Sequence, residues 1–306
     1  MKRLLVTGRD GFVGRTLARM VAGEADLGDW HLLEVPVDFD LRDRAWTDRL
    51  VGGWMPDAVI HLAAQSSVAE SFKDPAATLN INLIGTLHLL QALTKTGFTG
   101  RMVYVGTGDV YGTVDEADLP IVETLPPAPR NPYGVSKLAA ETLCRQWVYT
   151  EGMQIVLARP FNHIGPGQST LFAIPDFAKQ IVEIRHGQRE PVITVGDIDV
   201  TRDFTDVRDV VRAYFDLLRA GVAGEIYNVC SGVERTVRSM LERLLELAQA
   251  DVTVETDATR LRKAEQRRVC GSAAKIRAMT GWSPLLSIDD SLAAILNYWE
   301  GNPAHG

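Results

Sequence analysis

The sequence contains few cysteines and no long apolar run. Its 306 residues include three cysteines, Cys144, Cys230 and Cys270. Their odd number and wide spacing argue against a disulfide framework and against a metal site, so we expect reduced structural thiols. The apolar run that follows Met1–Arg3 is too short for a signal peptide or a membrane span. We therefore expect a cytoplasmic protein with no membrane partner.

Positive charge is also scarce. Lysine and arginine total 32 against 39 acidic residues, which gives a formal net charge of −7. This balance disfavours nucleic acid or an anionic membrane as a partner but permits a local basic pocket for a small phosphate ligand. The hydrophobic content of 46% and the charged content of 23% are those of an ordinary globular protein. The length suits one large domain or two coupled domains.

Short apolar runs alternate with longer amphipathic stretches in the first half of the chain. This alternation is typical of repeated strand–helix units, and it predicts an α/β fold with a doubly wound parallel (Rossmann) sheet. The predicted strands are Arg3 to Val6, His31 to Val35, Ala58 to Leu62, Met102 to Val105 and Gln154 to Arg159. The predicted helices are Gly14 to Ala22, Pro75 to Thr96 and Tyr133 to Glu151.

The sequence pattern changes after Pro160. We expect a glycine- and proline-bearing loop, a helix from Ile174 to His186, and then loops rich in aspartate and arginine. The strand-like run Tyr227–Val229 is expected to return to the first domain, before a helix from Thr236 to Gln249. These features predict a dinucleotide-binding domain formed by residues 1–162 plus about 204–235. A smaller, mostly C-terminal substrate-binding lobe would comprise about 163–203 plus 236–306.

The first predicted strand ends in a glycine-rich loop, Thr7–Gly14. Glycines permit a sharp turn and a close approach of pyrophosphate, and the following helix presents its positive end. An acidic residue that binds the ribose would fall near Glu34, yet no basic phosphate clamp is obvious, so NAD and NADP both stay open. The predicted cofactor-binding residues are Gly8, Gly11, Phe12, Val13 and Gly14 in this loop, Asp40 and Leu41 after the second strand, where an adenine contact would lie, and Leu62, Ala63 and Ala64 after the third. Asp40 could instead be a solvated loop residue.

Tyr133 and Lys137 lie four residues apart on one predicted helix face. Proton exchange near neutrality requires the tyrosine pKa to fall from about 10 by roughly 3 units, and a nearby ammonium would favour this. The pair alone also fits an ordinary surface helix. Thr107 follows a strand end, where doubly wound folds gather their ligands, and its hydroxyl could bind the reacting oxygen. Asp109 is either an acid or base, or the cap of a turn.

These motifs together resemble the extended short-chain dehydrogenase family, which acts mainly on nucleotide sugars. The resemblance implies that Tyr133 is the acid/base, that Lys137 holds the tyrosine and the nicotinamide ribose, and that Thr107 completes the triad. It also implies a homodimer in which the helices containing Leu89–Ala92 and Leu138–Leu143 form a four-helix interface. The apolar faces of these helices could instead be internal core. The motifs that carry the resemblance are the glycine loop, Leu62–Ala64, Asn82–Thr86, the Thr107 strand end, Tyr133–Lys137 and Arg159–Asn162.

The second half of the chain resembles the branch that contains GDP-mannose 4,6-dehydratases and GDP-4-keto-6-deoxy-D-mannose reductases, and the reductases more closely. The resemblance implies an NAD(P)H-dependent reduction that yields GDP-D-rhamnose from a GDP-sugar. Alternatives are a 4,6-dehydratase or epimerase on a related nucleotide sugar, or a non-catalytic NAD(P)-binding regulator. The remaining residues to which this resemblance assigns a role are Asn82 and Pro160 at the cofactor, and Asn162, Lys179, Arg202, Arg262 and Glu265 at the substrate.

Asp109 favours the reductase within this branch. A dehydratase of this family places a glutamate, often beside a second acid, after the catalytic threonine. This chain has Gly108 and Asp109 there. A carboxylate shorter by one methylene is displaced by about 1 Å, and a displacement of that order can reduce the rate about a hundredfold.

Overall fold

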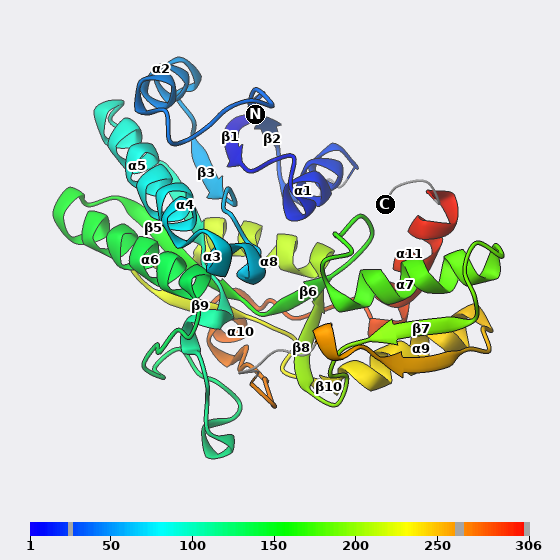
Figure 1. Cartoon of the computed structure of the whole chain (residues 1–306). Coiled ribbons are helices and arrows are strands. Elements are labelled where there is room, and N and C mark those ends of the chain that lie inside the picture. Colours follow the sequence, from blue (N-terminus) through cyan, green and yellow to red (C-terminus); the bar gives the residue numbers. More distant parts are fainter. Residues whose placement is uncertain (24–26, 261–265, 303–306) are drawn as a thin grey trace.

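The computed structural model describes residues 1–23, 27–260 and 266–302. A six-stranded parallel sheet with helices on both faces forms the larger part, and a smaller group of helices and short strands lies beside it (Figure 1). The predicted α/β doubly wound fold is confirmed. Each of the five strands predicted in the first half occurs, as does the strand at Tyr227–Val229, with ends that differ by up to three residues.

The strand order of the large sheet identifies its ligand-binding edge. The chain passes from the first strand to one neighbour and then returns to its other side, so the switch point lies between β1 and β3. Ligands of open α/β sheets bind outside the carboxyl ends of the strands at such a point. In spatial order the strands are β2 (Trp30–Leu32), β1 (Lys2–Thr7), β3 (Ala58–His61), β4 (Arg101–Val105), β5 (Gln154–Pro160) and β9 (Ile226–Val229).

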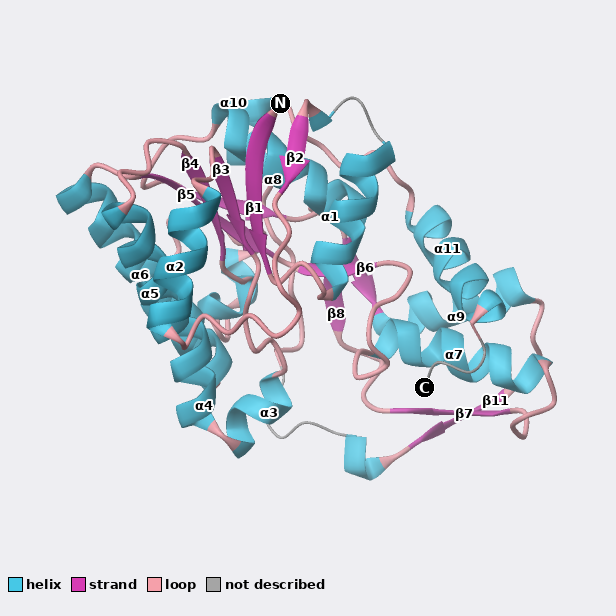
Figure 2. Cartoon of the chain, turned by 90° about the horizontal axis from the view of Figure 1, so that it is seen from above, coloured by secondary structure: helices cyan, strands magenta, loops and turns pink. Residues whose placement is uncertain are grey.

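Alternate side chains of the strands enter two separate cores. Leu4 and Val6 pack on the side of α1 and α8, whereas Leu5 packs on the side of α2, α5 and α6. Figure 2 shows these helix layers on opposite sides of the sheet. The helices of this part are α1 (Phe12–Gly23), α2 (Arg44–Trp54), α3 (Val68–Lys73), α4 (Pro75–Leu79), the π-helical turn η2 (Asn80–Ile84), α5 (Gly85–Lys95), α6 (Pro132–Glu151), α8 (Val207–Ala220) and α10 (Ala274–Thr280).

The helical run from Pro75 to Lys95 is long and apolar enough to cross a membrane by length and composition. In the structure Leu89, Leu90 and Leu93 are completely buried within the chain. The run is therefore a core helix of this fold, with a π turn in its middle. Leu89–Ala92, which the resemblance assigned to a dimer interface, contribute at least Leu89, Leu90 and Ala92 to the internal core.

The smaller part has its own hydrophobic core. Three helices enclose this core together with two small sheets, as Figure 2 shows beside the main sheet. Its helices are α7 (Ala173–Arg185), α9 (Val237–Ala248) and α11 (Ile288–Gly301). Its strands are β6 (Asn162–Ile164), β8 (Thr201–Asp206) and β10 (Glu234–Thr236) in one sheet, and β7 (Val192–Val195) and β11 (Thr253–Thr256) in the other.

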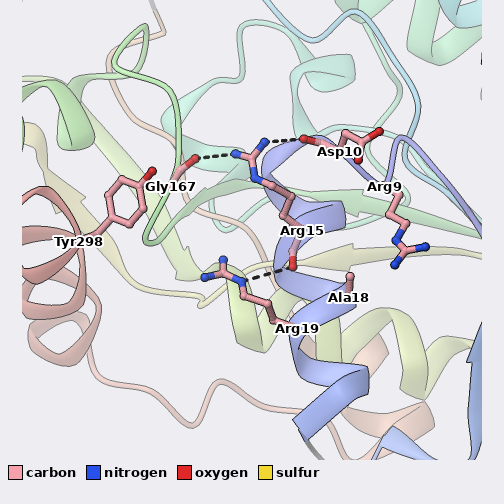
Figure 3. A pocket seen from close by; sticks show the side chains of 7 residues that line it. All are labelled: Arg9, Asp10, Arg15, Ala18, Arg19, Gly167 and Tyr298. Atoms are coloured by element: carbon pink, nitrogen blue, oxygen red, sulfur yellow. Dashed lines mark hydrogen bonds between the residues drawn. The ribbon is translucent and has the colours of Figure 1, made fainter. Parts of the chain in front are cut away.

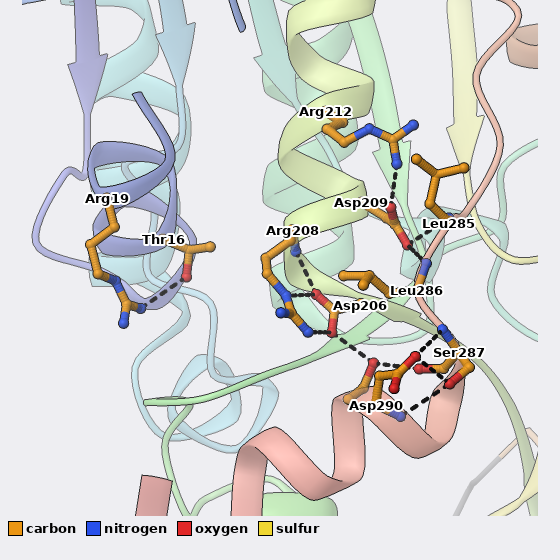
Figure 4. Close-up of polar contacts among 11 residues, drawn as sticks. Thr16, Arg19, Asp206, Arg208, Asp209, Arg212, Leu285, Leu286, Ser287 and Asp290 are labelled. Atoms are coloured by element: carbon orange, nitrogen blue, oxygen red, sulfur yellow. Dashed lines mark hydrogen bonds and ion pairs between the residues drawn. The ribbon is translucent and has the colours of Figure 1, made fainter. Parts of the chain in front are cut away.

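The prediction of loops after the helix at Ile174 to His186 is wrong. That segment contains β7 and β8 and continues into the helix α8. The many charged residues of this segment suggested loops. Several of its acids are instead buried, where they accept hydrogen bonds from backbone amides and other groups. Asp209 accepts hydrogen bonds from the N–H groups of Leu285 and Leu286, both at 3.0 Å, and Asp206 accepts one from the Ser291 hydroxyl at 2.7 Å. Figure 4 shows these two acids joining α8 to the start of α11.

Candidate active site

The glycine loop lies between β1 and α1 and is packed against the loop that follows β3. Gly8 has a positive φ of 72°, and a Cβ there would lie 2.7 Å from the nitrogen of Ala63. A Cβ on Gly14 would lie 2.4 Å from the Gly8 carbonyl oxygen. Gly11 meets only that same oxygen within 4 Å. The outer glycines thus close the turn, and the middle one leaves room for a ligand to approach the backbone.

The first turn of α1 is suited to an anion. The N–H of Arg15 is bonded to the Gly11 carbonyl, so the amides of the preceding turn remain available. The first turn contains no acidic residue. Phe12 stacks on His163 with ring centroids 6.0 Å apart, and this contact joins the loop to β6. The residues therefore fit a dinucleotide pyrophosphate, with Gly8, Gly11, Phe12, Val13 and Gly14 around it.

The other predicted cofactor residues lie near the carboxyl ends of the strands and make different structural contacts. Leu62, Ala63 and Ala64 follow β3, where the Ala63 amide donates to the Thr7 hydroxyl at 3.3 Å. Asn82 is 2% exposed, and its amide hydrogens bind the Gln65 carbonyl and the Ser136 hydroxyl. Asn82 thus connects the loop after β3 to α6. Pro160 ends β5, paired in register with Val229.

The two residues predicted to contact adenine have other partners. Asp40 forms an ion pair with Arg42 at 2.6 Å, and this guanidinium holds the Asp40 pKa below its ordinary value. Leu41 is 8% exposed and packs in the core on the α5 side. A contact of either side chain with adenine stays a prediction.

The helix α6 carries the predicted catalytic pair on its first two turns. Asn131 caps the helix by accepting the Gly134 N–H at 2.7 Å, and Pro132 occupies the first turn, where its missing N–H costs nothing. This start fixes Tyr133 at the beginning of the helix and Lys137 one turn later. Both therefore lie beside the carboxyl end of β4, where Thr107 follows the strand.

Tyr133, Thr107 and Asp109 come together at this strand end. The half-buried Tyr133 phenol is hydrogen-bonded to Thr107, and this bond lowers its pKa. Burial and the negative charge of Asp109 act more strongly and raise the Tyr133 pKa above its ordinary value. The fall in the Tyr133 pKa that proton exchange near neutrality would require is therefore not found. At neutral pH Tyr133 is a protonated phenol and a possible proton donor.

Lys137 is 3% exposed and lies within the fold next to Tyr104. Its ammonium is 4.9 Å from the Tyr104 ring centroid, and the Tyr104 hydroxyl donates to the Lys137 carbonyl at 3.0 Å. Burial lowers the Lys137 pKa to about 8, although Cys144 and Glu141 oppose this shift. The lysine is thus still mainly charged at pH 7 but titrates within an accessible range.

The Lys137 titration gives a pH prediction. Activity is expected to fall as the pH rises through about 8, because the ammonium is the charged form below that pKa and is lost above it. The measurement is kcat/KM from pH 6 to 10, which reports groups of the free enzyme. Circular dichroism over the same range provides the control for unfolding. A profile that stays flat to pH 10 would contradict the assignment.

The predicted substrate residues lie in separate elements. Asn162 is exposed at the start of β6. Lys179 on α7 is 3.4 Å from Glu183 and 5.8 Å from the ring centroid of Trp299. Arg202 on β8 donates to the carbonyls of Thr201 at 2.7 Å and Gln266 at 2.9 Å. Their binding of one substrate stays a prediction. Arg262 and Glu265 lie outside the described residues.

Sequence reasoning missed a buried ion pair between α6 and β5. Glu141 on α6 and Arg159 on β5 form two hydrogen bonds of 2.8 and 2.7 Å, with side chains 3% and 2% exposed. The Arg159 guanidinium also lies 4.8 Å from the Tyr111 ring centroid. The sequence did contain a signal that Glu141 faces the interior, because it lies one helical turn after Lys137 and therefore on the same helix face.

A buried histidine behind the glycine loop was also missed. The ring of His61 bridges the hydroxyls of Thr7 at 2.6 Å and Thr86 at 2.9 Å. Burial lowers its pKa to about 3, so the ring stays neutral. A histidine at the end of a strand predicted to be buried is the sequence signal for such a role.

A shallow pocket of about 340 Å³ is lined mainly by residues of α1 and the glycine loop, and neither Tyr133 nor Lys137 is among its lining residues. Figure 3 shows it between α1 and Tyr298 of α11. Arg15 crosses it and donates to the carbonyls of Asp10 at 2.5 Å and Gly167 at 3.0 Å. Arg9, on the glycine loop, also lines it.

The switch-point loop, the helix pair and the strand-end threonine define the class. The protein is an NAD(P)-dependent oxidoreductase of the extended short-chain dehydrogenase type. The chain belongs to the GDP-mannose 4,6 dehydratase family, which it matches over residues 33–295. The resemblance stated from the motifs is thereby confirmed.

Individual relatives agree with this assignment. The chain is 53% identical over 301 residues to GDP-6-deoxy-D-mannose reductase of Pseudomonas aeruginosa, with 98% of this chain and 97% of the relative covered. A solved structure described as RMD from Pseudomonas aeruginosa complexed with NADPH is 52% identical, covers 98% of this chain and 99% of its own, and superposes with a TM-score of 0.94. UDP-glucose 4-epimerase of Thermus thermophilus in complex with NAD is 29% identical, covers 98% and 99%, and has a TM-score of 0.85.

Proposed function

We propose that this protein reduces the C4 ketone of GDP-4-keto-6-deoxy-D-mannose to give GDP-D-rhamnose. The observation that carries the proposal is the protonated Tyr133 phenol, held by Thr107 beside the cofactor edge of the sheet. Reduction of a ketone requires a hydride and one proton. The high identity to a GDP-6-deoxy-D-mannose reductase supports the choice of substrate.

The protein's own groups manage the proton and the charge. The bound nicotinamide supplies the hydride. Thr107 orients the phenol, and Tyr133 donates its proton to the C4 oxygen as negative charge develops there. The buried Lys137 ammonium, with its pKa of about 8, stabilises the phenolate that remains. Proton return to Tyr133 from solvent completes the cycle.

The arrangement around Gly108 supports reduction over 4,6-dehydration. Dehydration also requires a base for the C5 proton and an acid for the C6 hydroxyl. A Cβ at Gly108 would lie 3.3 Å from three ring atoms of Phe161, so a second acidic side chain at this position would need the ring to move. Asp109, on the 3₁₀ turn η3 (Gly108–Tyr111), is then the only acid of the Thr107–Asp109 segment. The family's name makes the dehydratase the second candidate.

We also propose roles for the predicted substrate residues and for the two-lobe division of the chain. The separate core around α7, α9 and α11 supports a distinct substrate-binding lobe. Asn162 lies on β6 and Arg202 on β8. These paired strands lie at the junction of this lobe with the large sheet, since β6 follows β5 directly. In the proposal these two, with Lys179, Arg262 and Glu265, bind the GDP moiety.

We further propose a cytoplasmic homodimer. Apolar side chains remain exposed near α6, which supports an interface there: Val135 is 45% exposed, Tyr149 71%, and Phe72 on α3 62%. Leu138 and Leu143 are partly buried against the internal cores, so they would contribute only part of their surface. Sedimentation of the wild type and of a Val135→Glu variant tests this interface.

The assay that tests the function supplies two substrates separately. Purified protein is incubated with GDP-mannose and oxidised cofactor, and in parallel with the 4-keto-6-deoxy sugar and NADH or NADPH. We expect cofactor oxidation and GDP-D-rhamnose only in the second reaction. Conversion of GDP-mannose to the keto sugar without ketone reduction would make the protein a dehydratase.

A further inference from the structure

Gln266 connects the loop that follows η3 to the strands of the smaller lobe. Its side-chain oxygen Oε1 accepts the N–H of Val114 at 2.9 Å, and its Nε2 donates to the Val114 carbonyl at 2.9 Å. Nε2 also donates to the Arg268 carbonyl at 2.8 Å. The amide thus pairs with both backbone polar groups of a residue that lies 152 positions away. Because its oxygen and its nitrogen both have partners, the side chain is held in one orientation.

The main-chain carbonyl of Gln266 holds Arg202. The Nη1 of Arg202 donates to this carbonyl at 2.9 Å and to the carbonyl of Thr201 at 2.7 Å. A guanidinium is planar, so two backbone acceptors on one nitrogen fix the direction of the whole group. Thr201 is the neighbour of Arg202 on β8, whereas Gln266 belongs to a distant segment. The amide of Gln266 therefore fixes a carbonyl that in turn fixes Arg202.

A second contact between the same segments is more exposed. Arg268 donates to both carboxylate oxygens of Glu234 on β10, at 2.8 Å each, and to Glu116 at 2.9 Å. The Glu116 side chain is 72% exposed, and an ion pair of this kind contributes little to stability. The contact of the Gln266 amide with Val114 is partly buried. It is therefore the stronger of the two connections.

We propose that Gln266 is a positioning residue for the substrate, because it holds Arg202 in the direction in which the guanidinium meets the diphosphate of the sugar nucleotide. The inference rests on the proposed function, in which Arg202 binds the GDP moiety, and it adds a residue that acts through Arg202. A long side chain that is already held loses less rotamer freedom when a ligand binds. Gln266 thus contributes to substrate affinity without contact with the substrate.

A purely structural role for Gln266 makes a different prediction. The loop that Gln266 binds follows η3, which carries Asp109. If Gln266 only braced this loop, its loss would disturb the reacting groups and lower kcat. If it directs Arg202, its loss weakens the binding of ground state and transition state alike, which raises KM and leaves kcat unchanged. The division of the effect between KM and kcat separates the two roles.

The test uses Gln266→Met, which keeps the length of the side chain and removes its amide. Calorimetric titration with GDP and with NADPH is combined with steady-state kinetics on the 4-keto-6-deoxy sugar nucleotide. We expect the Kd of GDP and the KM of the sugar nucleotide to rise about fivefold to thirtyfold. The Kd of NADPH and kcat should stay within about twofold of the wild type. Gln266→Asn, whose amide is one methylene shorter, should change the same constants in the same direction.

A double-mutant cycle tests whether Gln266 acts through Arg202. In an Arg202→Ala background there is no guanidinium to direct, so the addition of Gln266→Met should change the Kd of GDP by less than about twofold. Additive losses from the two substitutions would overturn the proposal. It would also be overturned by a Gln266→Met variant with wild-type affinity for GDP, or by one with a lower kcat and an unchanged KM.

The matched control is Gln180→Met on α7. Gln180 makes the same kind of contact, because its Oε1 accepts the Thr194 N–H at 2.9 Å and its Nε2 donates to the Thr194 carbonyl at 3.3 Å. Its replacement should lower the thermal midpoint and leave the Kd of GDP within about twofold. An equal rise of this Kd in Gln180→Met and Gln266→Met would mean a general loosening of the lobe and would overturn the proposal. A wild type that binds no GDP would count against the proposed function itself.

Discussion

Replacing Tyr133 by phenylalanine is expected to lower ketone reduction about a hundredfold to ten-thousandfold, the usual contribution of general acid catalysis. The change removes one oxygen and keeps the ring. The Tyr133 phenol is the group whose protonation the site maintains, through burial and through Asp109, and Thr107 is its hydrogen-bond partner. Turnover should therefore fall while the dinucleotide still binds.

The measurement is single-turnover oxidation of the reduced cofactor, combined with calorimetric titration of that cofactor. Thr107→Ser provides the matched control, because it keeps the hydroxyl that orients the phenol and should retain most of the activity. Turnover of Tyr133→Phe within tenfold of the wild type would assign proton transfer to another group. Loss of cofactor binding together with turnover would give Tyr133 a structural role.

Local sequence patterns predicted the strands of the large sheet well. The strands of that sheet are buried on both faces and read as continuous apolar runs, and the glycine loop marks the point at which the first strand ends. The helix α6 was predictable because its cap, Asn131–Pro132, is a local signal. Helical spacing then placed Tyr133 and Lys137 on one face without knowledge of the fold.

The part after Pro160 was less predictable because its acids are buried by contacts from distant segments. Asp203 is completely buried, although desolvation raises its pKa. It accepts hydrogen bonds from the backbone of Ser231, Gly232 and Gly271, which lie up to 68 residues away. A sequence pattern counts such an aspartate as a loop residue. Only the tertiary structure supplies the amides that make it a core residue.

The presence of a lysine near Tyr133 was predictable, but the direction of the Tyr133 pKa shift was not. The sequence places a lysine near the tyrosine, and an ammonium favours phenolate. In the structure burial and the charge of Asp109 raise the Tyr133 pKa, and burial lowers the Lys137 pKa to about 8. Burial depends on the packing of α6 on the sheet, which no local pattern gives. The raised tyrosine pKa suits a reductase, which begins its reaction with a protonated donor.

Replacing Glu141 by glutamine is expected to lower the free energy of unfolding by about 3 to 5 kcal/mol, because it leaves the Arg159 guanidinium buried without its counter-charge. Both side chains are almost fully buried, and one guanidinium nitrogen, Nη1, already has no hydrogen-bond partner within the described structure. Denaturant unfolding at pH 7 measures the loss. The paired variant Glu141→Leu with Arg159→Leu is the control, since it removes both charges together and should be less unstable than Glu141→Gln alone.

The same substitution should also change the pH profile. The negative charge of Glu141 raises the Lys137 pKa against burial, so its removal lowers that pKa further. The fall in activity that the wild type shows near pH 8 should begin at a lower pH in Glu141→Gln, because the ammonium is lost earlier as the pH rises. Measurement of kcat/KM against pH at a temperature where the variant is folded tests this. A variant that loses stability but keeps the wild-type pH profile would limit Glu141 to holding α6 against β5, with no part in the charge of Lys137.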